Sequence, residues 1–382
     1  MEHLYFDHGA TTLLRREVKE AMIYSMDLFG NPSSLHDEGM RAKDEMEAAR
    51  ERVAGALGAS PREILFTGSG TESNNLAILG VARRHRNRGN HIITTQVEHP
   101  SVLETCRFLE KEGFRITRLP VDDYGIIDPI ELEKSLTPHT ILVSVMAGNN
   151  EVGSLMPIPA IASLLREKGI LFHTDAVQYF GKVPLDVANW GVDLLSIGGH
   201  KINGPKGVGA LFVRKGVRLD PVFFGGGHER GLRPGTHNLS GIIGLGVAVQ
   251  LAAKEAAETE TRLTRLRGRL WDQISREIDG THLNGHPVKR LPHNLNIRFE
   301  RVEGQAVMLE LNRVGIAVSS GSACSSGKGA PSHVLKAMGQ SDEEAYQSLR
   351  ITLGRETTEK DIDILTYRLQ KILVALRSRI RS

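Results

Sequence analysis

The sequence predicts an α/β fold in which a mostly parallel sheet is covered by helices, with a smaller α+β domain after it. Short apolar runs alternate with longer amphipathic segments through the first two thirds of the 382 residues, and this alternation is typical of βαβ units. Ligands of such sheets bind beyond the carboxyl ends of the strands, so we expect a site there. Strands are expected at residues 64–66, 92–95, 141–145, 170–173, 194–197 and 209–213, with helices between them at 72–86 and 158–168.

The last third of the chain has a different pattern. A long helix rich in Glu, Arg and Leu is expected to run from about residue 245 to about residue 278. A strand at 295–299 follows it, and a helix over 359–377 comes last. The chain changes from strand–helix alternation to longer, mixed elements, which indicates a second α+β domain.

The length of the chain also supports two domains. We expect a large α/β domain at residues 16–255 and a small α+β domain formed by residues 1–15 and 256–382. The sequence has no low-complexity linker between them. The two domains are therefore expected to pack rigidly.

Charge and cysteine content exclude several classes of protein. Lys and Arg number 48 against 45 Asp and Glu, so neither direct nucleic-acid binding nor a membrane surface is expected. Cys106 and Cys324 are the only cysteines, and no Cys or His spacing is typical of zinc. No apolar stretch approaches the ~20 residues of a membrane span, and residues 1–7 lack the pattern of a signal peptide. We expect a cytoplasmic protein with reduced cysteines.

Cys324 lies in a run of Ser and Gly, residues 319–329, with almost no apolar neighbours. Structural cysteines are usually small buried hydrophobes, and flanking glycines permit many backbone conformations. We therefore interpret Cys324 as an exposed, reactive thiol that moves. The alternative is a solvated loop in which the cysteine has no role. Cys106, within the helical pattern 102–112, is expected to lie in the core.

Lys201 follows the strand expected at 194–197, in a turn rich in Gly and Pro. Such a turn offers no surface along which the lysine stem can pack, and the position suits a Schiff base with a carbonyl cofactor. Asp175 ends the preceding strand, and pyridoxal phosphate (PLP) requires such a carboxylate opposite its ring nitrogen. The alternatives are a solvated surface turn for Lys201 and a turn or N-cap role for Asp175.

Residues 66–74 combine a strand end, a Gly-containing turn and a helix start. The free N–H groups of a helix N-terminus bind phosphate, so this segment is a candidate phosphate site. Ser69 and Glu72 also fit a capping box, which operates without a ligand.

Other polar residues follow strands or precede helices. His99 is suited to stacking on a planar ring, and Asn150 offers a carboxamide. Residues 225–236 are too rich in Gly and charged residues to form a packed helix or strand. They indicate a loop whose backbone can come close to a ligand or to another part of the protein. Arg355 precedes the last helix, where its guanidinium is suited to a bidentate contact with a carboxylate or, alternatively, to a surface ion pair.

These motifs occur in the order found in a known family. The chain resembles the PLP-dependent cysteine desulfurases of the NifS/IscS type, which belong to the class V aminotransferase family and have the fold of type I PLP transferases. The resemblance covers nearly the whole sequence. The matching segments are residues 5–12, 31–36, 71–75, 98–100, 149–153, 173–178, 200–201, 225–236 and the run around Cys324.

The resemblance implies how PLP is held. Lys201 would be the Schiff-base lysine, Asp175 the partner of the pyridine nitrogen and Gln178 the partner of the phenolic oxygen. His99 would stack on the ring and act in acid–base steps. The further contacts implied are Asn150 and, at the phosphate, Gly70, Thr71, His200 and Thr236, the last contributed by the partner subunit of a homodimer.

The resemblance also implies the reaction, the conversion of L-cysteine to L-alanine. Asn150 and Arg355 would hold the substrate carboxylate, and Cys324 would take the sulfur as a persulfide. The sulfur would then pass to an acceptor protein, such as an iron–sulfur scaffold, for cluster assembly or tRNA thiolation. No resident metal site is expected, and Cys324 would at most be a transient ligand of an iron–sulfur cluster.

One position departs from the family pattern, and other functions share parts of it. Gly198 stands where many relatives have Ser, so phosphate binding would depend more on the remaining contacts. A selenocysteine lyase or a class V aminotransferase would share Lys201 and Asp175, but a transaminase has no use for the thiol of Cys324. A non-catalytic sulfur-transfer scaffold would have no need of Lys201, Asp175 and Thr71 together.

Overall fold

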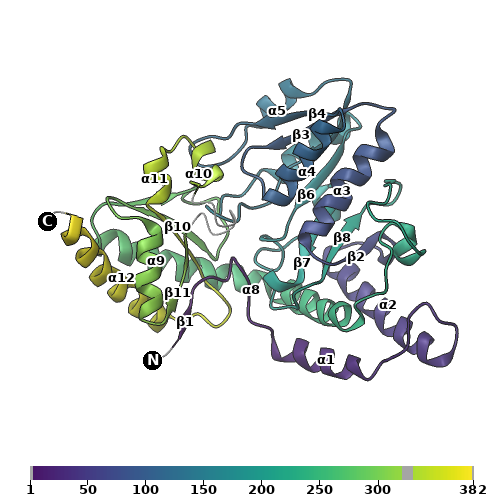
Figure 1. The fold of residues 1–382 in the computed structure, drawn as a ribbon, viewed down its shortest axis with the longest axis horizontal. Helices are drawn as coiled ribbons and strands as arrows, with labels where there is room; N and C mark the ends of the chain where they lie inside the picture. The colour runs from purple at the N-terminus through teal and green to yellow at the C-terminus, as the bar shows by residue number, and fades with distance from the viewer. Residues whose placement is uncertain (1–2, 321–329, 381–382) are drawn as a thin grey trace.

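The large sheet has seven strands in the order β2–β8–β7–β6–β5–β3–β4 (Figure 1). The computed structural model describes residues 3–320 and 330–380. Within the large sheet β8 is antiparallel to both of its neighbours, and every other pair is parallel. The predicted mostly parallel sheet is therefore confirmed. Its strands are β2 Ile64–Thr67, β3 His91–Thr95, β4 Arg115–Leu119, β5 Thr140–Ser144, β6 Leu171–Asp175, β7 Leu194–Gly198 and β8 Gly209–Val213.

Helices cover both faces of this sheet. Side chains alternate between faces along a strand: Leu65 packs with α3 (Gly70–His85) and α4 (Pro100–Lys111), whereas Phe66 packs in the core that α2 (Asp37–Leu57) and α6 (Ile158–Glu167) share. Both faces of the sheet are thus buried, which explains why its strands are apolar runs rather than alternating patterns. The remaining helices of this part are α1 Arg16–Met26, α5 Pro129–Ser135 and α7 Val187–Trp190, with the 3₁₀ turns η1 Pro61–Glu63, η2 Gly199–Lys201 and η3 His228–Gly231.

A second sheet of four strands, in the order β12–β13–β10–β9, forms the smaller part of the molecule (Figure 1). All of its pairs are antiparallel. One face carries a separate core, to which Phe6 from the N-terminal segment contributes. The elements of this part are β9 Thr281–Asn284, β10 Asn294–Phe299, β12 Ser319–Ser320, β13 Ser348–Thr352, the parallel pair β1 Leu4–Tyr5 and β11 Ile316–Ala317, and the helices α9 Gly304–Arg313, α10 His333–Ala337, α11 Asp342–Tyr346 and α12 Glu359–Ile380.

Helix α8 (Leu239–Glu277) joins the two parts. Its first half packs in the core of the large sheet and its second half in the core of the small sheet, so the boundary expected after residue 255 falls inside this helix. By length and composition alone α8 could cross a membrane, but 50% of that apolar window is buried within the protein. Val334 and Leu335 of α10 lie in the larger core, although the predicted division assigns them to the small domain.

The carboxyl ends of β3, β5, β6 and β7 lie at one edge of the large sheet, because these strands run in the same direction. Asp175 is the last residue of β6, and Lys201 lies on η2, directly after β7. From the small sheet, Arg350 of β13 donates a hydrogen bond to the Asn150 carbonyl oxygen, in the segment that follows β5. The fold therefore brings residues of both parts to one place.

Replacing Leu270 tests the packing of α8. Leu270 is fully buried in the small core, and Leu270→Ala leaves a cavity that should lower the free energy of unfolding by ~2–5 kcal/mol. Denaturant unfolding followed by circular dichroism measures this loss. Leu309→Ala, at an exposed position of α9, is the matched control and should cost less than ~0.5 kcal/mol; equal costs for the two variants would contradict the described core.

Candidate active site

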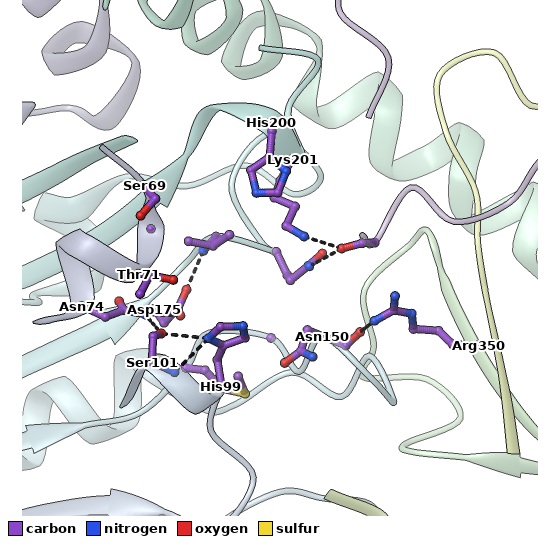
Figure 2. A pocket seen from close by; sticks show the side chains of 16 residues that line it. Ser69, Thr71, Asn74, His99, Ser101, Asn150, Asp175, His200, Lys201 and Arg350 are labelled. Carbon is purple, nitrogen blue, oxygen red and sulfur yellow. Dashed lines mark hydrogen bonds between the residues drawn. The ribbon is translucent and has the colours of Figure 1, made fainter. Parts of the chain in front are cut away.

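A cavity lies at the carboxyl edge of the large sheet, and Figure 2 shows its side chains converging from several elements. Most of the predicted cofactor residues line it, with one further residue from β13. Among the predicted residues that the structure describes, Thr236 and Arg355 do not line it, and Cys324 lies outside the described residues. The predicted residues that do line it are Gly70, Thr71, His99, Asn150, Asp175, Gln178, His200 and Lys201.

Lys201 reaches the cavity from the 3₁₀ turn after β7. Its Nζ donates hydrogen bonds of 2.6 Å to the carbonyl oxygens of Gly9 and Ala10. A second lysine, Lys182, lies buried behind it and donates from Nζ to the Lys201 carbonyl oxygen at 3.0 Å. Burial, aided by the charge of Lys201, lowers the pKa of Lys182 to about 8 even though Glu356 opposes the shift. The backbone and the amine of Lys201 are thus both held by hydrogen bonds.

Asp175 is fixed by donors on both of its carboxylate oxygens. Oδ1 accepts from the Val177 N–H at 2.9 Å, and Oδ2 accepts from Asn74 Nδ2 at 2.7 Å. The carboxylate is nearly buried at the wall of the cavity. Asn74 was not predicted as a functional residue, although it lies in the segment 71–75 that carries the resemblance.

The same asparagine connects Asp175 with His99. Asn74 Nδ2 also donates to Ser101 Oγ at 2.9 Å, and Ser101 Oγ lies 2.8 Å from His99 Nδ1. The Ser101 N–H donates to the same Nδ1 at 3.1 Å, so Nδ1 is an acceptor and the neutral ring carries its proton on Nε2. Burial lowers the pKa of His99, and this effect exceeds the opposing charge of Asp175.

The N-terminus of α3 forms another wall. Ser69 caps the helix by accepting the Glu72 N–H at 3.1 Å, but the Glu72 carboxylate accepts from the Gly68 N–H and pairs with Arg233, so only half of the predicted capping box forms. A Cβ on Gly70 would lie 2.6 Å from Val177 Cγ2. Glycine is therefore required where the backbone turns into the helix at the cavity.

Gly198 and His200 complete this wall. A Cβ on Gly198 would make only ordinary contacts, the nearest at 3.5 Å from Val177 and 3.7 Å from the Gly70 nitrogen. The serine of relatives would fit there without moving the backbone. His200 Nδ1 lies 3.2 Å from Thr11 Oγ1, and burial, reinforced by the charges of Lys201 and Lys206, lowers the pKa of His200 to about 4.

The arginine of the cavity is Arg350, and this corrects the expectation for Arg355. Arg350 on β13 donates to the Asn150 carbonyl oxygen and to Asp7 Oδ1, both at 3.0 Å, and its side chain is 3% exposed. The side chain of Arg355 is 50% exposed, and its Nε lies 3.9 Å from Glu255. Residue 355 follows the end of β13, where the chain has left the cavity. The run Ser-Leu-Arg-Ile-Thr at residues 348–352 gives no sequence signal for Arg350, because the burial of this arginine follows from the pairing of β13 with β10.

The other predicted residues have distinct positions. Gln178 Nε2 donates to the Gly9 carbonyl oxygen at 2.8 Å. Thr236 is exposed and lines a different hollow, together with Ser33 and Leu35. Cys106 is fully buried in the core, as predicted. Among the described residues no group of three or more His, Cys, Asp or Glu side chains is arranged to hold a metal ion.

The chain is similar over nearly its whole length to known proteins. The model of the family "Aminotransferase class-V" matches residues 4–365. The cysteine desulfurase IscS of Methanosarcina thermophila is 48% identical over 376 residues, which are 98% of this chain and 93% of that protein. Among solved structures, a NifS-like protein has a TM-score of 0.92 at 39% identity, covering 98% of this chain and 100% of its own. SspA in complex with cysteine has a TM-score of 0.81 at 38% identity, with 92% and 98% covered.

The chain belongs to the cysteine desulfurases of the class-V aminotransferase family. The fold of type I PLP transferases is thereby confirmed, and so is the dependence of the desulfurase on PLP. The residues present fit this cofactor: Lys201 supplies an amine, Asp175 a fixed carboxylate, and α3 an N-terminus at which no Cβ fits. Anionic groups bind well at such helix N-termini.

Glu98 underlies the cavity of the desulfurase as a fully buried acid. Its Oε1 accepts from Thr95 Oγ1 and from the Met146 N–H, both at 2.9 Å. Burial, reinforced by the charge of Asp175, raises the pKa of Glu98 to about 8 in spite of these hydrogen bonds. The ionised form is therefore unfavourable in the folded protein.

Glu98→Gln should remove a pH dependence of stability. The pKa of Glu98 is raised from 4.5 to about 8 in the folded protein. Between these two pH values the unfolded chain is ionised at Glu98 while the folded protein is still protonated, so wild type loses stability relative to Glu98→Gln as the pH rises. The loss is at most ~1.4 kcal/mol per pH unit. Thermal unfolding at several pH values measures the difference between the two proteins. Glu104→Gln, at an exposed position of α4, should show no such trend, and a pH-independent difference for Glu98→Gln would contradict a protonated Glu98.

Proposed function

We propose that this desulfurase converts L-cysteine to L-alanine, moving the sulfur first to Cys324 as a persulfide and then to an acceptor protein. The observation that carries the proposal is the meeting of Lys201, Asp175 and Arg350 in one cavity. An amine, a carboxylate and a guanidinium are the groups that PLP and an amino-acid substrate need. The similarity to SspA, which was solved with cysteine, supports L-cysteine as the substrate.

The residues of the cavity would divide the binding of PLP among them. Lys201 would hold it covalently, Asp175 would accept a hydrogen bond from its ring nitrogen, and Gln178 would contact its phenolic oxygen. The phosphate would lie at Gly70, Thr71 and His200, where the first N–H groups of a helix have no partner within the helix. When bound, PLP supplies an electron sink that stabilises the charge left by loss of the substrate Cα proton.

Proton transfers would fall to Lys201 and His99. The Lys201 amine takes the proton from Cα once it leaves the carbonyl oxygens of Gly9 and Ala10. His99 is neutral and carries its proton on Nε2, since Nδ1 accepts from Ser101. In this neutral form it offers a hydrogen bond from Nε2–H, and it would have to gain a proton before it could give one from Nε2. Asn74 Nδ2 donates both to Asp175 Oδ2 and to Ser101 Oγ, and Ser101 Oγ lies against His99 Nδ1, so these contacts keep this tautomer.

The substrate carboxylate would bind Arg350, with the Asn150 carboxamide beside it. Both line the cavity, and the guanidinium is already oriented by its bonds to Asp7 and to the Asn150 carbonyl oxygen. Charge-assisted hydrogen bonds from arginine are among the stronger polar contacts. This places the substrate between the small sheet and Lys201.

Sulfur transfer would then occur at Cys324. Its thiolate attacks the substrate sulfur, the bond between that sulfur and Cβ breaks, and the carbon skeleton leaves as alanine after Cβ is protonated. The persulfide sulfur passes to a protein acceptor that serves iron–sulfur cluster assembly or tRNA thiolation. We place this chemistry in a reducing cytoplasm, where thiols stay reduced.

A homodimer would complete the phosphate site through Thr236. Thr236 and Leu35 line one hollow, and large apolar side chains are exposed in the neighbouring segments: Phe29 is 80%, Leu35 93% and Phe224 84% exposed. Exposed apolar patches of this kind mark association surfaces. We therefore propose that a second copy covers this surface and receives Thr236 at its own cavity.

The proposal is tested by mass spectrometry of the Cys324 peptide after incubation with L-cysteine, with alanine measured in parallel. A gain of one sulfur together with alanine is expected, and both should disappear in Lys201→Ala. Unchanged alanine and sulfide production by Cys324→Ser would show that Cys324 is not the nucleophile. PLP-loaded protein that forms no alanine would exclude desulfurase activity.

The two arginines offer a matched test of substrate binding. Arg350→Gln removes charge-assisted hydrogen bonds worth ~1.5–3 kcal/mol, so the KM for L-cysteine should rise about 10- to 150-fold at an unchanged PLP content. Arg355→Gln should leave the KM within about twofold. Steady-state kinetics with alanine as the measured product compares them. The reverse order of effects would restore Arg355 as the substrate residue.

A further inference from the structure

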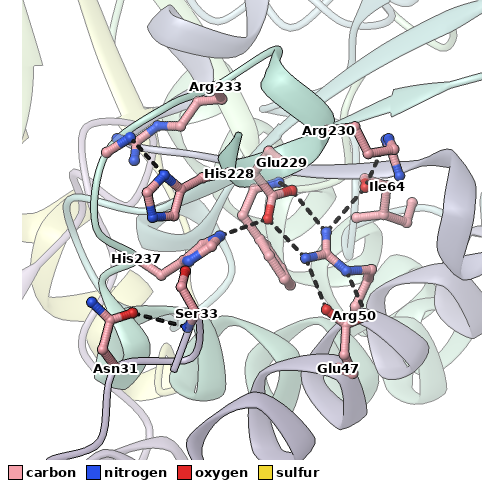
Figure 3. Close-up of polar contacts among 12 residues, drawn as sticks. Asn31, Ser33, Glu47, Arg50, Ile64, His228, Glu229, Arg230, Arg233 and His237 are labelled. Atoms are coloured by element: carbon pink, nitrogen blue, oxygen red, sulfur yellow. Dashed lines mark hydrogen bonds and ion pairs between the residues drawn. The ribbon is translucent and has the colours of Figure 1, made fainter. Parts of the chain in front are cut away.

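The loop of residues 225–236 is anchored by a buried ion pair, shown in Figure 3. Glu229 on η3 receives two parallel hydrogen bonds from Arg50 on α2: Nη1 to Oε2 and Nη2 to Oε1, each 2.8 Å. The side chains are 1% and 8% exposed, respectively. A bidentate pair fixes both the distance and the plane of its groups. It therefore ties the loop to α2 with one orientation.

The Glu229 carboxylate also binds two other parts of the fold. Its Oε2 accepts from the Phe66 N–H of β2 at 2.9 Å, and its Oε1 lies 2.8 Å from His237 Nε2. Burial alone would raise the pKa of Glu229, but the hydrogen bonds from Arg50 and His237 bring it to about 2. The carboxylate is therefore ionised throughout the physiological pH range, and it connects η3 and His237, directly after the loop, to α2 and β2.

The backbone at this anchor is strained. Glu229 and Arg230 have φ values of 45° and 60°, in the left-handed region that L-residues seldom occupy. Such conformations persist only where the surrounding contacts determine them. The middle of the loop is thus fixed, whereas Phe224, directly before the loop, and Thr236, its last residue, are exposed.

Thr236 is held through both of its neighbours in the chain. The Gly235 N–H donates to His228 Nδ1 at 3.3 Å, and His237 contacts Glu229 as described. The rings of His228 and His237 pack edge to face with centroids 5.2 Å apart. Thr236 is therefore positioned by its two neighbours in the chain: Gly235 bonds to His228, which precedes Glu229, and His237 contacts Glu229 itself.

We propose that Glu229, with Arg50 and His237, is the positioning group that presents Thr236 to the phosphate site of the partner subunit. This inference rests on the proposed homodimer, and it adds a residue that touches neither substrate nor cofactor. Loss of the Glu229 carboxylate should weaken PLP binding in the partner subunit and leave PLP binding in its own subunit unchanged.

Mixed dimers with a single functional lysine test this. In the first dimer one chain is wild type and keeps Lys201. Its partner carries both Glu229→Gln and Lys201→Ala. In the second dimer one chain keeps Lys201 and carries Glu229→Gln. Its partner carries only Lys201→Ala. Both dimers contain the same two substitutions, so any general loss of stability is equal in them.

The measured quantity is the PLP that remains on Lys201 after dilution, fixed by borohydride reduction and counted by mass spectrometry. We expect at least tenfold faster loss of PLP in the first dimer than in the second. Equal loss in both dimers would show that Glu229 only stabilises its own chain and would overturn the inference. Glu47→Gln removes another, more exposed partner of Arg50 and should give equal, slow loss in both arrangements.

Thr236→Ala in the same two arrangements separates this inference from the proposed dimer. If Thr236→Ala accelerates PLP loss only from the partner and Glu229→Gln does not, the dimer stands and Glu229 is not the positioning group. If Thr236→Ala has no effect across the interface, both the proposed contribution of Thr236 and the inference are wrong. Equal effects of the two variants across the interface are the result we expect.

Discussion

Helix α8 belongs to two hydrophobic cores at once, and the geometry of the cavity depends on this sharing. Residues 242–249 pack against the large sheet and residues 263–274 against the small one. A continuous helix cannot change the spacing of its ends without breaking backbone hydrogen bonds. The small sheet is therefore fixed relative to the strand ends that carry Asp175 and Lys201. Arg350 extends this connection by its hydrogen bond to the Asn150 carbonyl oxygen, so the walls of the cavity from both sheets share one frame.

Burial determines the charges in the cavity more than ion pairs do. It lowers the pKa of His99 and brings the pKa of His200 to about 4, so both rings are neutral at physiological pH. Asp175 remains the fixed carboxylate, held by two donors. Neutral histidines donate and accept hydrogen bonds without competing with Lys201 and Arg350 for anionic groups.

Much of the fold and most of the cavity could be predicted from the sequence, because apolar strands followed by polar turns show both the sheet and its carboxyl edge. β4 was missed, since its pattern Arg-Ile-Thr-Arg-Leu belongs to an edge strand that is mostly half-buried. Arg350 was missed because its strand is recognisable only when paired with β10. Asn74 and Glu229 act through partners distant in the sequence, such as Asp175 and Arg50. No local pattern identifies such pairs.

The burial of Cys106 has a practical consequence. Its thiol is fully buried in the core beneath α4, and burial raises its pKa to about 12. Thiolates, and not thiols, react with alkylating reagents and with sulfur donors. The folded desulfurase therefore withholds one of its two cysteines from this chemistry. When the native protein consumes an alkylating reagent or gains a sulfur atom at a cysteine, the change can be assigned to Cys324. No cysteine has to be removed by mutation for this assignment.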